Sequence, residues 1–562
     1  MSYKEEIFLG AVALTAIALF LWGIGRHFIK YRRGSAHISA SNITLGIKRM
    51  VTDLLTHRTL MKRDRYAGYA HAGIFFGFGI VSLGVAVLLL EIIRFLIIVH
   101  FDVAHPVFYM RFWEGNFYLI FSLGMDLGHL ALIMGILMMM WRRATFRLSK
   151  LNYLRAYQGE TELRKSAKVW RIEDWIFLSV FLLIEFQGFT QEGVRLVIYR
   201  PEWAMWSPVG LFVAETFKAF GMSKETAVVI RDANWWMHSV LALAFTAAIP
   251  WYKAKHIIAA LGSLLMRVEK PLARLPREDE NSVNAGVARI SDFSWKDMLN
   301  FDACTRCGRC HDVCPARTTG FPLSPRDLIL DLRVHNDNAQ GVPQNGIELI
   351  GDVINAETLW ACRTCGACQE ICPVGIEHPP MIVKMRRQLV DRGNMDPLLQ
   401  GTLDTIASTG NSFGENSRKR STWKRELVFE VKDIRKNAAE SMWFVGDYAS
   451  FDPRNQKVSR VFASLMKAGG VDFAVLHEGE RNSGNDVRRV GEEGMYETLV
   501  EENLEAFSGA QNFNRIITTD PHSYNTIKNE YPEFGKIPPV EFYCSVLAEM
   551  LKSGKLKVTK KL

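Results

Sequence analysis

The sequence has almost no cysteine outside two short segments. Eight of its nine cysteines lie within residues 304–314 and 362–372, so a disulfide framework of the kind found in small secreted proteins is excluded. Charged residues are scarce in the first 260 positions, where several mostly apolar segments of 18 or more residues exclude a wholly soluble chain. No basic patch stands out beyond the loops that flank those segments, so the net charge of +9 does not predict a nucleic-acid partner. The 34 Phe, 14 Trp and 15 Tyr exclude a disordered chain.

Five apolar segments are long enough to cross a membrane, at about residues 7–25, 67–98, 116–141, 174–199 and 234–252. The loops at 26–65 and 142–171 are rich in Lys and Arg, whereas the loops at 99–115 and 200–232 are not. Because basic loops stay in the cytoplasm, we expect a multi-pass protein of a prokaryotic cytoplasmic membrane. Its N-terminus would lie outside, and everything after Lys253 would lie in the cytoplasm.

Histidines lie in or beside these segments, and an ionisable residue inside a membrane predicts a functional site. His238 and His256 are five helical turns apart, so we expect them to share one face of one helix, about 27 Å apart. That spacing suits two stacked haem irons. Depth along the spans pairs His71 with His256 for an inner b-type haem, and His129 with His238 for an outer one. His100 and His105 are reserve ligands for the outer haem, and the plainer alternative for any one histidine is a satisfied core residue.

Two short motifs resemble the nitrate reductase gamma-subunit family of dihaem cytochromes b. They are Tyr69-Ala70-His71 and Trp235-Trp236-x-His238, together with His256. The resemblance covers about residues 1–265 and implies an all-α, five-helix transmembrane cytochrome b domain. It also implies electron exchange with a quinone, which we expect to be menaquinone. Val81 stands where that family has a second histidine, so the outer haem would depend on His129.

The fourth apolar segment carries a polar stripe that includes Glu185 and Glu192. Charged groups at such depth need a cavity or a partner, and a carboxylate near a quinone has protons to take or give. We therefore predict a quinone site with Glu185 and Glu192 as its acid–base groups. The alternative is that Glu192 pairs with Arg195, three residues further on.

Two copies of the ferredoxin run Cys-x2-Cys-x2-Cys-x3-Cys-Pro begin at Cys304 and Cys362. Three closely spaced thiolates bind a cubane [4Fe–4S] cluster, and in two-cluster ferredoxins the fourth Cys of each run serves the other cluster. The sequence therefore predicts two [4Fe–4S] clusters with crossed ligands. The first is assigned Cys304, Cys307, Cys310 and Cys372, and the second Cys362, Cys365, Cys368 and Cys314.

The long interval between the runs resembles the α-helical ferredoxin domain of the succinate dehydrogenase iron–sulfur subunit and of heterodisulfide reductase. We place this domain at 295–400, after a polar linker at 266–294 and before a connector at 401–439. Free thiolates and such clusters need a reducing compartment, which agrees with the cytoplasmic placement.

Residues 440–562 alternate short apolar runs with helical ones, which predicts an α/β domain. Words such as Phe451-Asp452-Pro453-Arg454 resemble the Cys-Cys-Gly domain of heterodisulfide reductase iron–sulfur subunits. The five cysteines that bind that family's non-cubane cluster are replaced here by oxygen-bearing side chains, which suit iron–sulfide clusters poorly. The replaced positions are Asp447, Asn482, Ser483, Asp520 and Ser523. We therefore predict a degenerate Cys-Cys-Gly domain that has kept its fold and lost its cluster.

Two further expectations concern this domain. The sharper alternative for the replaced positions is a metal or proton site made of Asp447, Asp520 and His522. The remaining cysteine, Cys544, is expected to be a buried small apolar residue.

These patterns predict a membrane-bound electron-transfer oxidoreductase subunit that works within a hetero-oligomeric complex. It would pass electrons between a cytoplasmic redox partner and the membrane quinone pool. Chains that fuse these two halves serve electron-transfer flavoprotein:quinone oxidoreduction, so the resemblance implies an electron-transfer flavoprotein, or a flavin or Cys-Cys-Gly subunit, as partner. The alternative is a membrane anchor or scaffold of a heterodisulfide reductase-like complex whose catalytic Cys-Cys-Gly domains lie on another chain.

Overall fold

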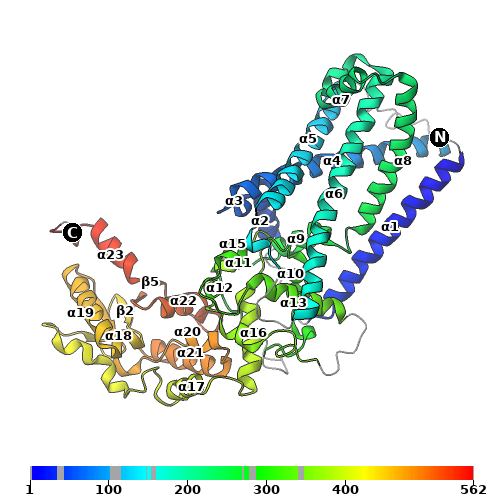
Figure 1. The fold of residues 1–562 in the computed structure, drawn as a ribbon. Helices are drawn as coiled ribbons and strands as arrows, with labels where there is room; N and C mark the ends of the chain where they lie inside the picture. Colours follow the sequence, from blue (N-terminus) through cyan, green and yellow to red (C-terminus); the bar gives the residue numbers. More distant parts are fainter. Residues whose placement is uncertain are drawn as a thin grey trace.

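The computed structural model describes residues 3–34, 43–101, 115–146, 148–153, 160–268, 271–277, 286–339 and 347–560. Three parts follow one another along the chain (Figure 1). An elongated helix bundle runs from α1 (Tyr3–Tyr31) to α8 (Lys224–Ala248), and a central part of short helices lies at its base. The C-terminal domain lies on the far side of the central part. The central part therefore stands between the bundle and the C-terminal domain.

Long helices build the bundle, and three of the described ones are long and apolar enough to cross a membrane. These are Phe8–Tyr31, Arg65–Val87 and Gly115–Thr145. The other two of the five expected spans fall in α6 and α8, where polar side chains interrupt the apolar sequence. The remaining bundle helices are α2 (Ile43–Thr56), α3 (Arg58–Met61), α4 (Arg65–Phe101), α5 (Gly115–Thr145), α6 (Glu160–Tyr199), α7 (Pro208–Ala219) and α9 (His256–Leu265).

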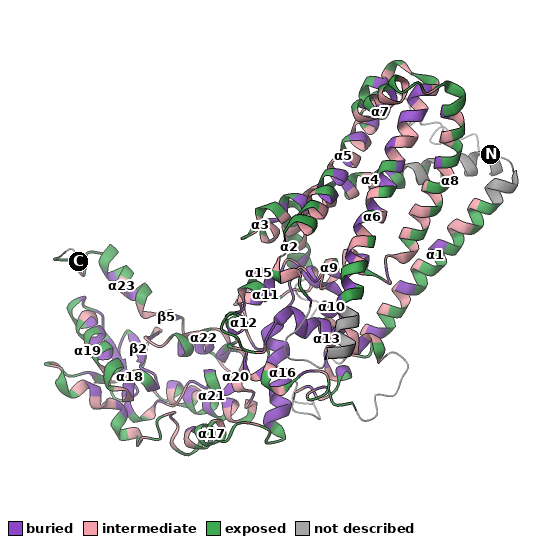
Figure 2. Cartoon of the chain, viewed as in Figure 1, coloured by how far each residue is buried: buried purple, intermediate pink, exposed green. Residues whose placement is uncertain are grey.

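The outer surface of the bundle is apolar. Leu14 is 69% exposed, Leu83 67% and Ile120 67%. Figure 2 shows exposed and half-buried residues along the bundle helices, whereas buried residues gather in the central part and the C-terminal domain. Large exposed apolar surfaces mark interaction with a membrane or a partner, and on these long helices a membrane is the simpler reason.

The helix that carries His238 stops before His256. α8 ends at Ala248, and α9 begins at His256. Pro250 lies between them, and proline has no N–H for the helical ladder and clashes with the preceding turn. The prediction that His238 and His256 share one continuous helix, about 27 Å apart, is therefore wrong.

The central part packs its short helices around one apolar core. Phe293 and Phe301 lie edge to face in it, with ring centroids 5.3 Å apart. Described residues of the expected linker join this packing: Val287 is 2% exposed, and its N–H donates to the carbonyl of Lys384 at 3.0 Å. The helices are α10 (Trp295–Ala303), α11 (Arg309–Val313), α12 (Pro315–Thr318), α13 (Pro325–Asn338), α14 (Ala356–Trp360), α15 (Ala367–Ile371) and α16 (His378–Asp391).

The C-terminal domain is built on five parallel strands in the order β1-β3-β2-β4-β5. Met442 and Phe444 point into one core and Trp443 into the other, because side chains alternate across a strand. The domain has the alternating strands and helices that its sequence predicts. The strands are β1 (Lys432–Asp433), β2 (Ser441–Phe444), β3 (Phe473–Val475), β4 (Arg515–Thr518) and β5 (Val540–Phe542). The helices are α17 (Pro397–Thr409), α18 (Asp447–Phe451), α19 (Pro453–Ala468), α20 (Asn485–Val490), α21 (Glu493–Ser508), α22 (Pro521–Asn529) and α23 (Tyr543–Lys552).

Residues 401–439, expected as a connector, belong to this domain. Lys432 and Asp433 form the edge strand β1, which pairs with β3. Trp423 is 1% exposed, and its ring lies 5.1 Å from that of Trp443. The segment has few apolar residues, but those few complete the cores on both faces of the sheet.

One buried carboxylate joins the bundle to the central part. Asp174 in α6 is 1% exposed. It accepts hydrogen bonds from Lys253 Nζ at 2.6 Å, Arg143 Nη1 at 2.9 Å, Arg306 Nη2 at 2.9 Å and Tyr153 Oη at 3.0 Å. Because Arg306 belongs to the first cysteine run, this carboxylate ties that run to the bundle.

Asp174→Asn should loosen the junction. An amide cannot neutralise three cations, and removing one partner of a buried ion pair costs about 3–5 kcal/mol. We expect a lower midpoint of thermal unfolding in detergent and faster proteolytic separation of the bundle from the rest. Glu173→Gln is the matched control, because Glu173 contacts Arg306 at 2.7 Å from a more exposed position. Equal midpoints in the two variants would contradict the role of Asp174.

Candidate electron-transfer site

The two cysteine runs form two loops with the same backbone conformation. The second residue after the first Cys has a positive φ in both, 61° at Arg306 and 48° at Thr364. Gly308 and Gly366 follow with φ of 72° and 73°. At Gly308 a Cβ would lie 2.1 Å from the carbonyl oxygen of Lys150, so no other residue fits this turn.

The turns direct backbone N–H groups at the sulfur atoms. The N–H of Thr364 donates to Cys362 Sγ at 3.3 Å, and the N–H of Ile376 donates to Cys372 Sγ at 3.4 Å. Hydrogen bonds of this kind tune the reduction potential of iron–sulfur clusters. The loops are therefore shaped for sulfur atoms that carry charge.

Cysteines of the two runs meet crosswise. A small cavity is lined by Cys362, Cys365 and Cys368 together with Cys314, the fourth Cys of the first run. Burial, and then the neighbouring thiol of Cys307, raise the pKa of Cys372 to about 12. The structure thus brings the fourth Cys of each run to the other run. The assignment of these two sets to two clusters stays a prediction, and the sulfur donors fit it.

A cavity of about 510 Å³ lies between the bundle and the central part. His57, His71 and His256 line it, and so does Cys307 of the first cysteine run. Apolar side chains of α4, α6 and α9 form much of the remaining wall, beside several cations. The cations are Arg142, Arg143, Lys150, Lys253 and Arg309. An apolar pocket with histidines and cations suits a haem, whose macrocycle is apolar and whose propionates are anionic.

His71 and His256 each use one ring nitrogen within the protein. His256 Nδ1 lies 2.7 Å from the carbonyl oxygen of Lys253, so Nδ1 carries the proton and Nε2 is the acceptor. His71 Nδ1 lies 3.3 Å from His57 Nε2, and a proton donated along this contact makes His71 Nε2 an acceptor too. Metal-bound histidines almost always donate their other N–H in this way. The pair predicted for the inner haem therefore has the chemistry of ligands.

Sequence reasoning missed His57. It precedes α3, has a φ of 48° and is 3% exposed, with its ring centroid 5.4 Å from that of His71. It lies in a segment expected to be a cytoplasmic basic loop, where a histidine carries no signal. Only the turn between α2 and α4 brings it into the cavity.

The outer histidines meet a carboxylate. His129 Nδ1 lies 2.5 Å from Glu185 Oε2, so a predicted haem ligand and a predicted quinone-site residue form one pair. Glu185 is 2% exposed. His238 Nδ1 is buried with no hydrogen-bond partner in the described part of the chain. Of the two reserve ligands, His105 lies outside the described residues, as does the side chain of His100.

Glu192 has a different partner. Its carboxylate accepts from Arg195 at 2.6 and 2.8 Å, and the guanidinium lies 4.7 Å from the ring centroid of Trp203. This is the alternative considered for Glu192 in the sequence. Because the ion pair satisfies both charges, the acid–base role predicted for this stripe rests on Glu185.

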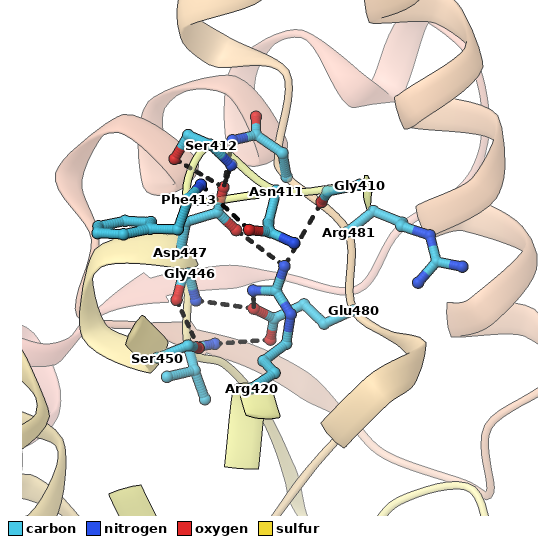
Figure 3. Close-up of polar contacts among 12 residues, drawn as sticks. Gly410, Asn411, Ser412, Phe413, Arg420, Gly446, Asp447, Ser450, Glu480 and Arg481 are labelled. Atoms are coloured by element: carbon cyan, nitrogen blue, oxygen red, sulfur yellow. Dashed lines mark hydrogen bonds and ion pairs between the residues drawn. The ribbon is translucent and has the colours of Figure 1, made fainter. Parts of the chain in front are cut away.

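A polar network surrounds Asp447, one of the positions at which the sequence predicts a lost cysteine (Figure 3). Arg420 donates to Asp447 at 2.8 Å and to Glu480 at 3.0 Å, and all three side chains are buried. Asp447 also accepts from Asn482 Nδ2 at 2.6 Å. Burial raises the pKa of Glu480 to about 7, although Arg420 opposes the shift. The groups that replace the thiolates thus satisfy one another, and the domain closes its core with ion pairs.

Asp447, Asp520 and His522 do not converge. Asp520 accepts from the backbone N–H of His522 at 3.1 Å, whereas the His522 ring lies 2.8 Å from Asp486. Over the described ranges, no three His, Cys, Asp or Glu side chains close around a single metal ion, so these three residues carry no metal-site proposal. Cys544, expected to be buried, is exposed, because it is the second residue of α23 at the edge of the domain.

Comparisons with known proteins agree with the cysteine runs. Residues 300–376 match the family model of the 4Fe-4S dicluster domain. The probable iron–sulfur-binding oxidoreductase FadF of Bacillus subtilis is 34% identical over 428 residues, which are 68% of this chain and 60% of that protein. The EtfAB:quinone oxidoreductase of Syntrophomonas wolfei is 32% identical over 546 residues, 89% of this chain and 71% of that protein. No solved structure matches the chain.

A more distant relative belongs to the dihydromethanophenazine:CoB–CoM heterodisulfide reductase of Methanosarcina mazei. This heterodisulfide reductase polypeptide is 26% identical over 290 residues, 46% of this chain and 65% of that protein. The fold, the cysteine runs and these relatives define an iron–sulfur electron-transfer oxidoreductase. The chain belongs to the family of iron–sulfur oxidoreductases that includes EtfAB:quinone oxidoreductase. The predicted resemblance to heterodisulfide reductase is confirmed, and the resemblance to a cytochrome b stays a prediction.

Cys365→Ser should remove one cluster. Two [4Fe–4S] clusters hold about eight irons, so loss of a ligand of the second set should leave about four irons and one EPR signal. Cys544→Ser, which changes an equally exposed cysteine outside both runs, should keep about eight. Iron and acid-labile sulfide assays measure the difference. A wild-type content that matches three clusters would contradict the degenerate character of the C-terminal site.

Proposed function

We propose that the chain passes electrons between a soluble redox partner and a membrane quinone, through two [4Fe–4S] clusters and b-type haem. The observation that supports this most is the cavity shared by His71, His256 and Cys307. A haem site and the first cysteine set would then have a common wall. When bound, these groups supply one-electron transfer. The chain itself holds them in line and keeps water away.

His71 and His256 would hold the inner haem, each through Nε2. His57 would orient His71 through the 3.3 Å contact, and the carbonyl of Lys253 orients His256 at 2.7 Å. Arg309, whose guanidinium donates to the carbonyls of Leu60 and Lys62, would receive a haem carboxylate. His57 is thus a positioning residue, and its loss should weaken haem binding by about 10–100-fold.

The soluble partner would approach the second cysteine set. A cleft of about 380 Å³ is lined by Cys362 and Arg363 from the central part and by Arg489 and His522 from the C-terminal domain. Cys365 is exposed, so this set lies near solvent, whereas the first set adjoins the cavity. Basic side chains favour an acidic partner surface. An electron-transfer flavoprotein, or a flavin or Cys-Cys-Gly subunit, is the proposed partner in a hetero-oligomeric complex.

The quinone, which we propose to be menaquinone, would bind near the His129–Glu185 pair. A buried carboxylate bonded to an imidazole is suited to move a proton at the His129 ring. The same pair would equally orient His129 as a ligand of an outer haem with His238. These two roles differ in the number of haems they require.

The membrane arrangement proposed here has α6 and α8 as two further spans, shielded by their contacts with α1, α5 and α7. The N-terminus would lie outside, and both cysteine runs in the cytoplasm. That arrangement puts the cluster sites in a reducing compartment.

A second candidate function is a membrane anchor or scaffold in a heterodisulfide reductase-like complex. The closed Arg420 network favours it, because the C-terminal domain then needs no cluster and offers a docking surface. Purification of the native complex distinguishes the two functions. A flavoprotein in the complex supports quinone oxidoreduction, and a subunit with intact Cys-Cys-Gly domains supports the scaffold.

His256→Ala should abolish the inner haem and leave the clusters in place. We expect the b-type bands of the redox-difference spectrum to lose the contribution of the inner haem, with about eight irons retained outside haem. His335→Ala is the matched control, since His335 lies in α13 and does not line the cavity. An unchanged spectrum in His256→Ala would refute the ligand assignment.

His129→Ala and Glu185→Gln should separate the outer haem from the quinone site. If His129 binds an outer haem, the pyridine haemochrome ratio falls from two haems per chain to one in His129→Ala. If the pair serves the quinone, that ratio does not change, and both variants lose turnover with a soluble quinol analogue. Glu192→Gln is the control, because its ion pair with Arg195 lies apart from His129. Normal turnover and an unchanged haem ratio in both variants would show that neither the outer haem nor the quinone depends on His129 and Glu185.

A further inference from the structure

The two cysteine runs share more than their loops. Each is followed by a 14-residue helix, α13 after the first and α16 after the second. Each helix carries an arginine eight residues after its first residue, Arg333 in α13 and Arg386 in α16. Both side chains are buried, at 7% and 5% exposure. The repetition makes these arginines part of the cysteine unit.

Both guanidinium groups reach the first cysteine of their own run. Arg333 Nη1 donates to the carbonyl oxygen of Cys304 at 3.0 Å, and Arg386 Nη2 donates to that of Cys362 at 2.6 Å. Arg386 also donates to the carbonyl of Leu359 at 2.7 and 3.0 Å. The charge of each arginine therefore lies against the backbone of the first cysteine of its run.

Neither arginine has a carboxylate partner among the residues that the structure describes; the acceptors found are backbone carbonyls. Arg387, the neighbour of Arg386, shows the contrast. It is 3% exposed, but it pairs with Glu493 at 2.7 Å. A buried cation without a counter-charge is costly. Four thiolates around an iron–sulfur core would supply the missing negative charge beside Arg333 and Arg386.

We propose that Arg333 and Arg386 are positioning residues that fix the first cysteine of each run and raise the reduction potential of the cluster it holds. Reduction adds one negative charge, and a fixed cation in a low-dielectric interior stabilises the reduced form. Arg333 would act on the cluster of Cys304, and Arg386 on the cluster of Cys362. The proposal rests on the cluster assignment made above.

The test is an EPR-monitored redox titration of the full-length protein in detergent. Arg386→Gln should make reduction of the Cys362 cluster at least tenfold less favourable, a fall of about 59 mV for one electron. The Cys304 cluster should keep its potential, and Arg333→Gln should give the reverse pattern. The signal lost in Cys365→Ser identifies the Cys362 cluster. Arg386→Lys, which keeps the charge, should restore most of the shift.

Arg387→Gln is the matched control, because the charge it removes is already balanced by Glu493. It should leave both potentials unchanged. Unchanged potentials in Arg386→Gln with both clusters present would overturn the proposal. If Arg386→Gln loses its cluster, Arg333→Gln becomes the test. An unchanged potential of the Cys304 cluster in that variant would overturn the proposal, and a fall would support it. Wild-type protein without two cluster signals would instead refute the cluster assignment.

Discussion

The buried charge of Asp174 determines how the bundle and the cluster region fit together. Cations from three separate segments converge on it, and one of them, Arg306, lies inside the first cysteine run. Another, Lys253, offers its carbonyl to His256. Because the three cations would repel one another without the acid, Asp174 stabilises the contact as a whole. One interaction thus holds the wall of the histidine cavity and the first cysteine loop in register.

Buried arginines elsewhere in the chain differ in what neutralises them. Arg420 pairs with two carboxylates, those of Asp447 and Glu480, so the charges at this buried site satisfy one another. Arg333 and Arg386 have backbone carbonyls only, within the described residues, and each stands beside a set of cysteines. The same physical rule, that a buried charge needs a partner, therefore separates the two kinds of site. Around Arg420 the protein itself supplies the anions. Where it does not, thiolates and iron can supply them.

The polar side chains of α6 fit the same rule inside the bundle. Glu185 meets His129, and Glu192 meets Arg195, so no described carboxylate of this stripe faces lipid alone. Exposed apolar side chains lie on neighbouring helices, for example Leu83 on α4 and Ile120 on α5. The described carboxylates of this stripe therefore each have a cationic or imidazole partner, which is what a membrane requires of ionisable groups.

Several features were determined by the sequence alone, because their signals are local. The spacing of the cysteine runs and the short apolar runs of β2, β3 and β4 can each be read within a few residues. Tertiary structure decided the rest. Pro250 ended the helix that was expected to join His238 to His256, and the turn through α3 brought His57 to His71. That no described carboxylate pairs with Arg386 could not be read from its own neighbourhood, because Arg387 looks the same in sequence. Whether a buried cation meets an acid depends on which distant segments pack against it, and only the folded chain determines that.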